Sequence, residues 1–438
     1  MAKRADAWKL YGMMACCLAG MIVATSWYLV RRQAAGFGGI RRPIAVSAKG
    51  QPYAAAISPD GTEVATIRVE HTGVVPADVI EVRDVGQDRE VADFTLPPVN
   101  SAPGKTQFYL NRKLSYCDAG KYLLAVTGLD TLEVIDARSF TVHASISLSG
   151  FHLADSRAFT DLRFVPLVQN DCAAASPLAV LGFWGDLGLR SIKLVDLEKG
   201  VEVADLSDRF AGTYRGDGLA ISPDGSKIAL ATWKDPEGSE VELVDARAGA
   251  VLKPLPLGDE LRIKHHLAFA GEGALVIGEL GCEPEGICSD LKPTAGGRSF
   301  RLWSFAEAGA VKRLGGSGEE SYRSTDASAD GSVVFGYTGD EIYCRKCNSG
   351  SGEIRVKDAR FTVWDRATGR AVARSSRLRV VQHACPWLTI GSCAESEQVP
   401  ELQMSGNGKA FLAFWPQTGL QLADHDSDSN VLEVFRLR

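Results

Sequence analysis

The sequence lacks an excess of positive charge, because 48 Lys and Arg residues stand against 54 Asp and Glu residues and the net charge is −6. Without a global positive field, nucleic acid is not an expected partner. The sequence also lacks a Gly-x-Ser-x-Gly elbow, a phosphate-binding loop and an HExxH segment. These are common local signatures of catalytic or nucleotide sites, so their absence gives no reason to expect a cofactor or a catalytic residue.

Long uncharged apolar runs are also scarce, and the one at residues 10–30 reads LYGMMACCLAGMIVATSWYLV. As a helix it would span about 31 Å, the thickness of the hydrocarbon layer of a membrane. We therefore expect a short tail at residues 1–9, a single transmembrane signal anchor at 10–30 and a linker at 31–43. A cleaved signal peptide is the alternative, because Lys3, Arg4 and Lys9 precede the run, but the run is long and no Ala-x-Ala site follows it.

Cysteine is present in an even set of eight beyond the predicted anchor, and six of the eight form three close pairs. Close pairs are typical of disulfides in an oxidising compartment. The sequence thus predicts an extracytoplasmic, periplasmic or extracellular body with disulfides drawn from Cys117, Cys172, Cys282, Cys288, Cys344, Cys347, Cys385 and Cys393. A zinc site at Cys282, Cys288, Cys344 and Cys347 is the alternative.

A repeated turn dominates the rest of the chain, which is rich in glycine. Ile-Ser-Pro-Asp-Gly occurs at residues 57–61 and again at 221–225. Pro and Asp-Gly favour a tight turn, and alternating apolar residues on both sides predict a strand before it and a strand after it. Weaker copies are CDAG at 117–120, AGEG at 270–273, SADG at 328–331 and SGNG at 405–408. A seventh unit, LRFVPLVQNDC leading into PLAVLGFWG, lacks the turn signature.

Each unit supplies about four short strands, which indicates radial repetition of small sheets. The sequence therefore predicts an all-β fold, a seven-bladed β-propeller over residues 44–438. The last unit ends on its third strand, and residues 44–47 (IAVS) are expected to supply the fourth and close the ring. Closure removes two sheet edges that would otherwise favour aggregation.

These repeats resemble those of WD40-like and YVTN-type β-propellers of the extracytoplasmic bacterial sort, which read ISPDG followed by V-D-x-x-T-G-x-x-V. The resemblance covers residues 44–438 and implies the propeller fold. It implies little about chemistry, because propellers carry many functions.

One face of such a ring should carry the binding site. The connections between second and third strands are long, and the three close cysteine pairs fall on that side, which we name the long-loop face. Alignment of the first strands on their turns places polar residues at the channel mouth on this face. A protein or a small polar or anionic ligand would meet these candidate binding residues: Arg112, Lys113, Asp161, Asp217, His265, His266, Arg323 and Glu401.

Two other motifs receive simple interpretations. His265 and His266 are adjacent in a strand and point to opposite faces, so they are not expected to share a metal ion. Asp424, Asp426 and Asp428 alternate in a loop, but Phe435 stands where a calcium loop needs its bidentate Glu. The leading hypothesis is thus a membrane-anchored, non-catalytic binding scaffold, and the alternative is a propeller hydrolase or lyase that uses Arg112, Asp217, His265 and Arg323.

Overall fold

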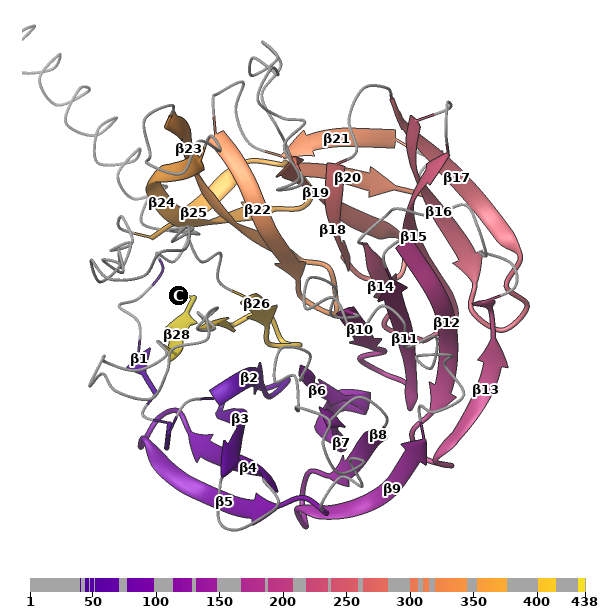
Figure 1. Cartoon of the computed structure of the whole chain (residues 1–438). Helices are drawn as coiled ribbons and strands as arrows, with labels where there is room; N and C mark the ends of the chain where they lie inside the picture. Colours follow the sequence, from indigo (N-terminus) through magenta and orange to yellow (C-terminus); the bar gives the residue numbers. More distant parts are fainter. Residues whose placement is uncertain are drawn as a thin grey trace, which may run out of the picture.

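The computed structural model contains seven antiparallel sheets of four strands each, arranged in a ring (Figure 1). It describes residues 40, 44–46, 48–50, 52–70, 77–97, 113–127, 131–147, 167–185, 188–207, 218–234, 238–258, 263–282, 300–305, 310–314, 320–344, 353–375, 401–414 and 432–437. The prediction of an all-β, seven-bladed propeller is confirmed. Within these ranges no helix has the length and apolar character needed to cross a membrane. The expected anchor at residues 10–30 lies outside them.

Each of blades 1 to 4 is built from four consecutive strands. Blade 1 contains β2 (Pro52–Ile57), β3 (Glu63–Glu70), β4 (Ala77–Asp84) and β5 (Arg89–Thr95). Blade 2 contains β6 (Lys113–Cys117), β7 (Tyr122–Thr127), β8 (Thr131–Asp136) and β9 (Thr141–Ser147), with a short 3-10 helix at Asp118–Gly120. Blade 3 contains β10 (Leu167–Cys172), β11 (Leu178–Gly185), β12 (Gly188–Asp196) and β13 (Val201–Asp205). Blade 4 contains β14 (Leu219–Ile221), β15 (Lys227–Lys234), β16 (Gly238–Asp245) and β17 (Val251–Gly258).

The remaining three blades include the one that closes the ring. Blade 5 contains β18 (Ile263–Phe269), β19 (Ala274–Cys282), β20 (Phe300–Ser304) and β21 (Ala310–Leu314). Blade 6 contains β22 (Glu320–Ala327), β23 (Val333–Cys344), β24 (Glu353–Asp365) and β25 (Ala371–Arg374). Blade 7 contains β26 (Glu401–Met404), β27 (Ala410–Phe414), β28 (Leu432–Arg436) and β1 (Ile44–Ala45).

The core lies between neighbouring blades rather than inside any one of them. Every residue of β7 is buried, whereas the outermost strand β9 is mostly exposed. Apolar residues of blades 1 and 2 form one cluster, with Ile67 and Ile80 packed against Leu123 and Ile135. Similar clusters lie between the other blades, including a stacked Phe411 and Phe435 in blade 7. A single blade has two apolar faces, so each blade depends on both of its neighbours.

The N-terminal strand closes the ring as the sequence predicted. Ile44 pairs with Val434 and Ala45 with Glu433. The backbone N–H of Val46 also donates to the carbonyl of Leu432 at 3.0 Å. The strand is shorter than the expected four residues, so other contacts must help to hold this seam.

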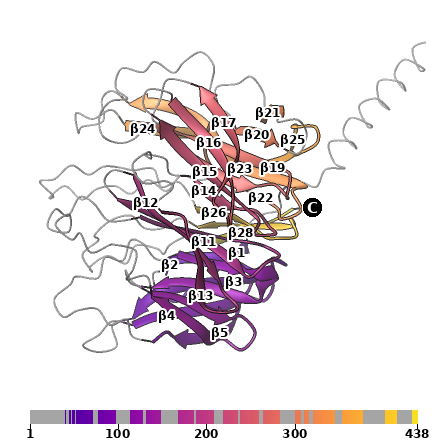
Figure 2. The same cartoon turned by 90° about the vertical axis from the view of Figure 1, so that its right-hand side faces the viewer.

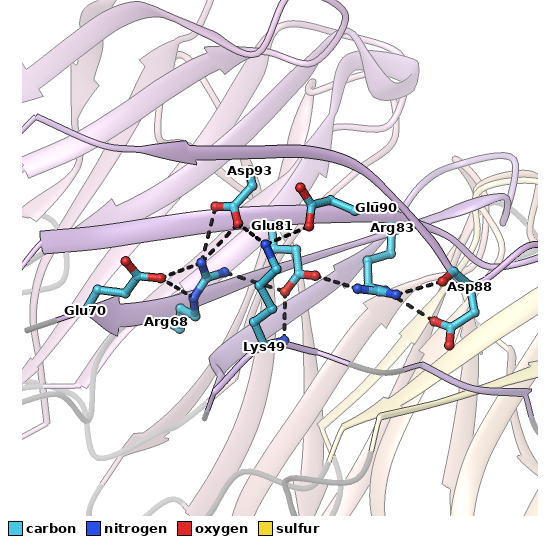
Figure 3. Close-up of polar contacts among 8 residues, drawn as sticks. All are labelled: Lys49, Arg68, Glu70, Glu81, Arg83, Asp88, Glu90 and Asp93. Carbon is cyan, nitrogen blue, oxygen red and sulfur yellow. Dashed lines mark hydrogen bonds and ion pairs between the residues drawn. The ribbon is translucent and has the colours of Figure 1, made fainter.

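A buried ionic network supports the same seam (Figure 3). The side chain of Glu81 is fully buried; it accepts the backbone N–H of Lys49 at 2.9 Å and Nη1 of Arg83 at 2.7 Å. Arg68, almost fully buried, lies 3.5 Å from Glu81. Outward from this centre, Lys49 Nζ bonds Asp93 at 2.7 Å. The segment between β1 and β2 is therefore fixed to blade 1 by charge as well as by packing.

We name the turn that follows the first strand of each blade its anchor turn. Four anchor turns, at residues 58–61, 222–225, 328–331 and 405–408, follow a common design, and the others lie at residues 117–120, 173–177 and 270–273. In blade 1, Asp60 accepts the hydroxyl of Ser58 at 2.6 Å and the N–H of Thr62 at 3.0 Å. Asp224, Asp330 and Asn407 make the equivalent bonds. The last residue of each of these four turns is a glycine with positive φ, between 66° and 75°. The short polar side chain thus accepts the hydrogen bonds of the turn and the glycine adopts its positive φ, as the known residue preferences of tight turns predict.

The anchor turns also contact one another at every seam of the ring, and we name the whole the turn belt. Direct hydrogen bonds link blade 7 to 1 (Asn407 N to Pro59 O), 2 to 3 (Ala119 N to Ala174 O), 3 to 4 (Ala175 N to Pro223 O), 4 to 5 (Asp224 N to Glu272 Oε1) and 6 to 7 (Ala329 N to Gly406 O). Blades 1 and 2 meet at Pro59 and Gly120, and blades 5 and 6 at Ala270 and Gly331. On this face of the propeller, the turns thus join each blade to both of its neighbours.

The tightest of these contacts predicts a sensitive glycine. A Cβ on Gly331 would lie 2.3 Å from the backbone of Ala270, and its φ is +69°. Gly331→Ala should therefore lower the free energy of unfolding by about 3 kcal/mol, from backbone strain plus a clash that no side chain can relieve. Gly50→Ala is the control, because its φ is +62° but the nearest atom is 3.6 Å away; it should cost only about 1 kcal/mol. If urea unfolding showed equal losses of stability for the two variants, the contact between Gly331 and Ala270 in the turn belt would be contradicted.

The ionic network at the closing seam predicts a second difference. Glu81→Ala leaves two guanidinium groups and one backbone N–H without their shared acceptor, so it should lower the free energy of unfolding by about 3 kcal/mol. Glu90→Ala removes only a pair between Lys49 and a side chain that is 39% exposed, and should cost less than about 1 kcal/mol. Thermal or urea unfolding of the two variants measures the contrast, which would be absent if the seam did not depend on Glu81.

Candidate functional site

The central channel is lined by the first strand of each blade. The strands β2, β6, β10, β14, β18, β22 and β26 pack against one another in that order around the centre of the ring (Figure 1). In the side view of Figure 2 the strands run across the thickness of the ring, so each inner strand has one end on each face. Anchor turns follow the inner strands on the face of the turn belt, so the opposite ends mark the long-loop face.

Five of the eight expected mouth residues lie on inner strands. Lys113 begins β6 and Glu401 begins β26; His265 and His266 belong to β18, and Arg323 belongs to β22. Their side chains, and the whole of Arg112, Asp161 and Asp217, lie outside the described residues. The structure thus places five backbone positions on the channel wall, and the assignment of a binding role to them stays a prediction.

The inner strand of blade 3 requires a different alignment from the one the sequence suggested. The described strand is β10, which begins at Leu167 and is followed by the turn at residues 173–177. Counted back from that turn, the position of Lys113 corresponds to Gln169 rather than to Asp161. The sequence misaligned this blade because its turn reads Ala-Ala-Ala-Ser-Pro and lacks Asp-Gly.

One level of the inner strands was not singled out by sequence reasoning. We name it the clamp position; it lies two residues before each anchor turn and is occupied, from blade 1 to blade 7, by Ala56, Ser115, Asp171, Ala220, Ala268, Asp326 and Gln403. Long polar side chains on an inner strand among apolar neighbours were the signal that could have identified it.

The three long side chains at the clamp position make the same contact with the next blade. Asp171 accepts the backbone N–H of Ile221 at 2.8 Å. Asp326 accepts that of Met404 at 2.6 Å, and Gln403 accepts that of Ile57 at 2.8 Å. Each bond joins two inner strands, so these residues tie blade 3 to 4, blade 6 to 7 and blade 7 to 1.

The two carboxylates at this level have unusual electrostatics. Both residues are partly exposed as a whole, but their carboxyl groups are enclosed by protein. Burial raises the pKa of Asp171 to about 6, against the opposing effect of the N–H groups of Ile221 and Cys172. Burial raises the pKa of Asp326 to about 7, and the negative charge of Asp171 adds to that effect. Ionised carboxylates in a poorly hydrated site are disfavoured, which explains the common direction.

A disulfide lies beside the first of these carboxylates. Cys117 and Cys172, which end the inner strands β6 and β10, are bonded to each other and link blades 2 and 3. Cys282 and Cys344 end β19 and β23, but their side chains, together with Cys288, Cys347, Cys385 and Cys393, lie outside the described residues. The other disulfides and the zinc alternative are therefore still predictions. Among the residues that the structure describes, no group of His, Cys, Asp and Glu is placed to hold a metal ion.

Comparison with known proteins supports the fold. No protein-family model matches the chain, and no curated protein matches it. The β-propeller domain of Cps50 (Swd1) from Myceliophteria thermophila is similar in structure, with a TM-score of 0.52 and 12% identity over 90% of this chain and 100% of that domain. Hydrazine synthase from Kuenenia stuttgartiensis aligns with a TM-score of 0.49 and 12% identity over 84% of this chain and 94% of its own.

The shared architecture defines a class and no more. Seven four-stranded blades around a channel make this chain a seven-bladed β-propeller, a fold commonly used as a scaffold for protein interactions. At 12% identity the likeness shows the fold alone. The WD40-like and YVTN-type assignment is still a resemblance of the repeat motif.

The disulfide predicts a measurable contribution to stability. The bond joins cysteines separated by 55 residues, and closing a loop of that length should stabilise the fold by about 4 kcal/mol through the unfolded chain. Replacing both Cys117 and Cys172 by Ser should lower the free energy of unfolding by about the same amount. A reductant should lower the free energy of unfolding of the unaltered protein more than that of the double variant. Recovery of both cysteines as free thiols from unreduced, denatured protein would contradict the assignment.

Proposed function

We propose that this chain is a non-catalytic β-propeller scaffold that binds a protein or a small polar or anionic ligand through its long-loop face. The observation that carries the proposal is the turn belt, which commits the backbone of one face to contacts between blades. The other face receives the long connections of the sequence and the mouth of the channel. Binding on propellers commonly uses such loops on a rigid ring.

The proposal includes a membrane anchor at residues 10–30 and a body outside the cytoplasm. Support comes from the apolar run itself and from the disulfide between Cys117 and Cys172, a bond typical of oxidising compartments. The alternative function is a hydrolase or lyase with its polar site at the channel mouth, which Arg112, Asp217, His265 and Arg323 would form. The mixed charge of that set favours recognition of a polar ligand in both cases.

Site-directed photo-crosslinking in native membranes tests which face binds. A photo-reactive residue in place of Lys113 or Arg323 should give a discrete adduct with the partner. The same residue in place of Lys121 is the control, because Lys121 is exposed beside an anchor turn and pairs there with Glu198 at 3.0 Å. Adducts from position 121 alone would overturn the choice of face.

Alanine substitution distinguishes the proposed binding function from the alternative enzymatic function. Replacing Arg112, Asp217, His265 and Arg323 together should weaken capture of the crosslinked partner at least about tenfold, which corresponds to about 1.4 kcal/mol. The full-length protein should show no turnover of ester, peptide or polyuronide substrates. Turnover that His265→Ala abolishes would establish the enzyme instead, and unchanged capture by the fourfold variant would remove the channel mouth from both functions.

A further inference from the structure

Two blades on opposite sides of the channel carry a carboxylate at the clamp position. Asp171 belongs to blade 3 and Asp326 to blade 6, so three of the seven steps around the ring separate them and the channel lies between them. Each accepts two backbone N–H groups, one from its own strand and one from the next blade. Both lie on inner strands, which line the channel.

The fold itself requires only a hydrogen-bond acceptor at this level. Gln403 occupies the clamp position of blade 7 and accepts the N–H of Ile57 at 2.8 Å with a neutral amide. A neutral side chain therefore makes the same bond between blades. The charge of Asp171 and Asp326 is not needed for this contact, and burying it costs free energy.

No ion pair to either carboxylate exists among the side chains that the structure describes. Among the described side chains of β6, β11 and β14, the strands that contact β10, the titratable group is Tyr116, which packs in the cluster between blades 1 and 2 and not toward Asp171. Burial raises the pKa of Tyr116 far above its usual range. Around Asp326, the described parts of β18, β19, β23 and β26 contribute Tyr337 and the neutral Gln403. Lys113, His265, His266, Arg323 and Glu401 lie on the same strands nearer the long-loop face.

We propose that Asp171 and Asp326 form a proton-binding pair, through which the central channel changes from two negative charges to none as the surrounding pH falls from weakly alkaline to weakly acidic. Each carboxylate takes one proton from solvent and becomes a neutral carboxylic acid, with no other reactant. The negative charge of Asp171 also raises the pKa of Asp326, so the protonation state of one residue influences the other. This proton site stands independently of the proposed binding function.

The proposal carries a stability consequence with a definite sign. Both groups have a raised pKa in the folded protein, about 6 and about 7 against an ordinary 3.8. Their contribution to stability is therefore complete below about pH 4 and is lost as the pH rises through those values. The urea concentration at the midpoint of unfolding should therefore decrease as the pH rises from about 5 to about 8. Asp326→Gln should make this decrease smaller, because it keeps a hydrogen-bond acceptor and removes the charge.

Infrared difference spectroscopy on the full-length protein tests the proton site directly. Lowering the pH from about 8 to about 5 should produce the C=O band of a protonated carboxylic acid, a signal that histidine does not give and that ordinary surface carboxylates give only at lower pH. Asp171→Asn and Asp326→Asn should each remove about half of this band, and the double variant should remove most of it, because burial also raises the pKa of Glu133 and Glu433. In Asp171→Asn the remaining band should appear at a lower pH, because repulsion across the channel is gone.

A matched control comes from the same blade. Asp330 lies four residues from Asp326, and although burial acts to raise its pKa, hydrogen bonds from Ser328 and Ser332 lower it. Asp330→Asn should therefore leave the band unchanged. If the Asn variants do not fold, Asp171→Gln and Asp326→Gln replace them, since Gln403 shows that this side chain suits the position. Absence of the band from the unaltered protein above about pH 5, or a band of unchanged intensity in the double variant, would overturn the proposal.

Discussion

The contact of each anchor turn with the next is the constraint on which the rest of this propeller depends. The turns are short, and their glycines allow backbones to approach where a Cβ would not fit, as at Gly331 against Ala270. With the turns locked, the inner strands that precede them are held at one common level. That level explains why Asp171, Asp326 and Gln403, three residues far apart in sequence, make the same bond to a neighbouring strand.

Closure of the ring is a separate problem, because the chain must join its two ends without a covalent link. Within the described residues, the N-terminal strand contributes Ile44 and Ala45 to the last sheet, which is a short pairing for one of the seven seams of the ring. Further contacts stabilise this seam: the apolar cluster of Val46, Val64 and Leu412, the bond from Ile57 to Gln403, the bond from Asn407 to Pro59 and the network around Glu81. A fully buried carboxylate is acceptable there because two guanidinium groups and a backbone N–H surround it.

The repeat unit made the blade count and the closing strand predictable, because Ser-Pro-Asp-Gly fixes a turn and a turn fixes two strands. Blade 3 was misaligned for the same reason, since it keeps the strand but not the Asp-Gly. The clamp position was missed because its partners lie in the next blade, up to 346 residues away in the case of Ile57 and Gln403. No local pattern encodes such a pairing, and only the common level of the inner strands reveals it.

A neutral residue and two acidic residues thus occupy equivalent places, and the comparison separates what the fold needs from what it carries in addition. Gln403 supplies one acceptor to the next blade without a charge. Asp171 and Asp326 supply the same acceptor and also accept the N–H of the residue that follows each of them. The second bond lowers the cost of an ionised group, yet burial outweighs it, as the raised pKa of both residues shows. The charge therefore works against the stability of the ring at neutral pH, and the acceptor alone accounts for the contact between blades.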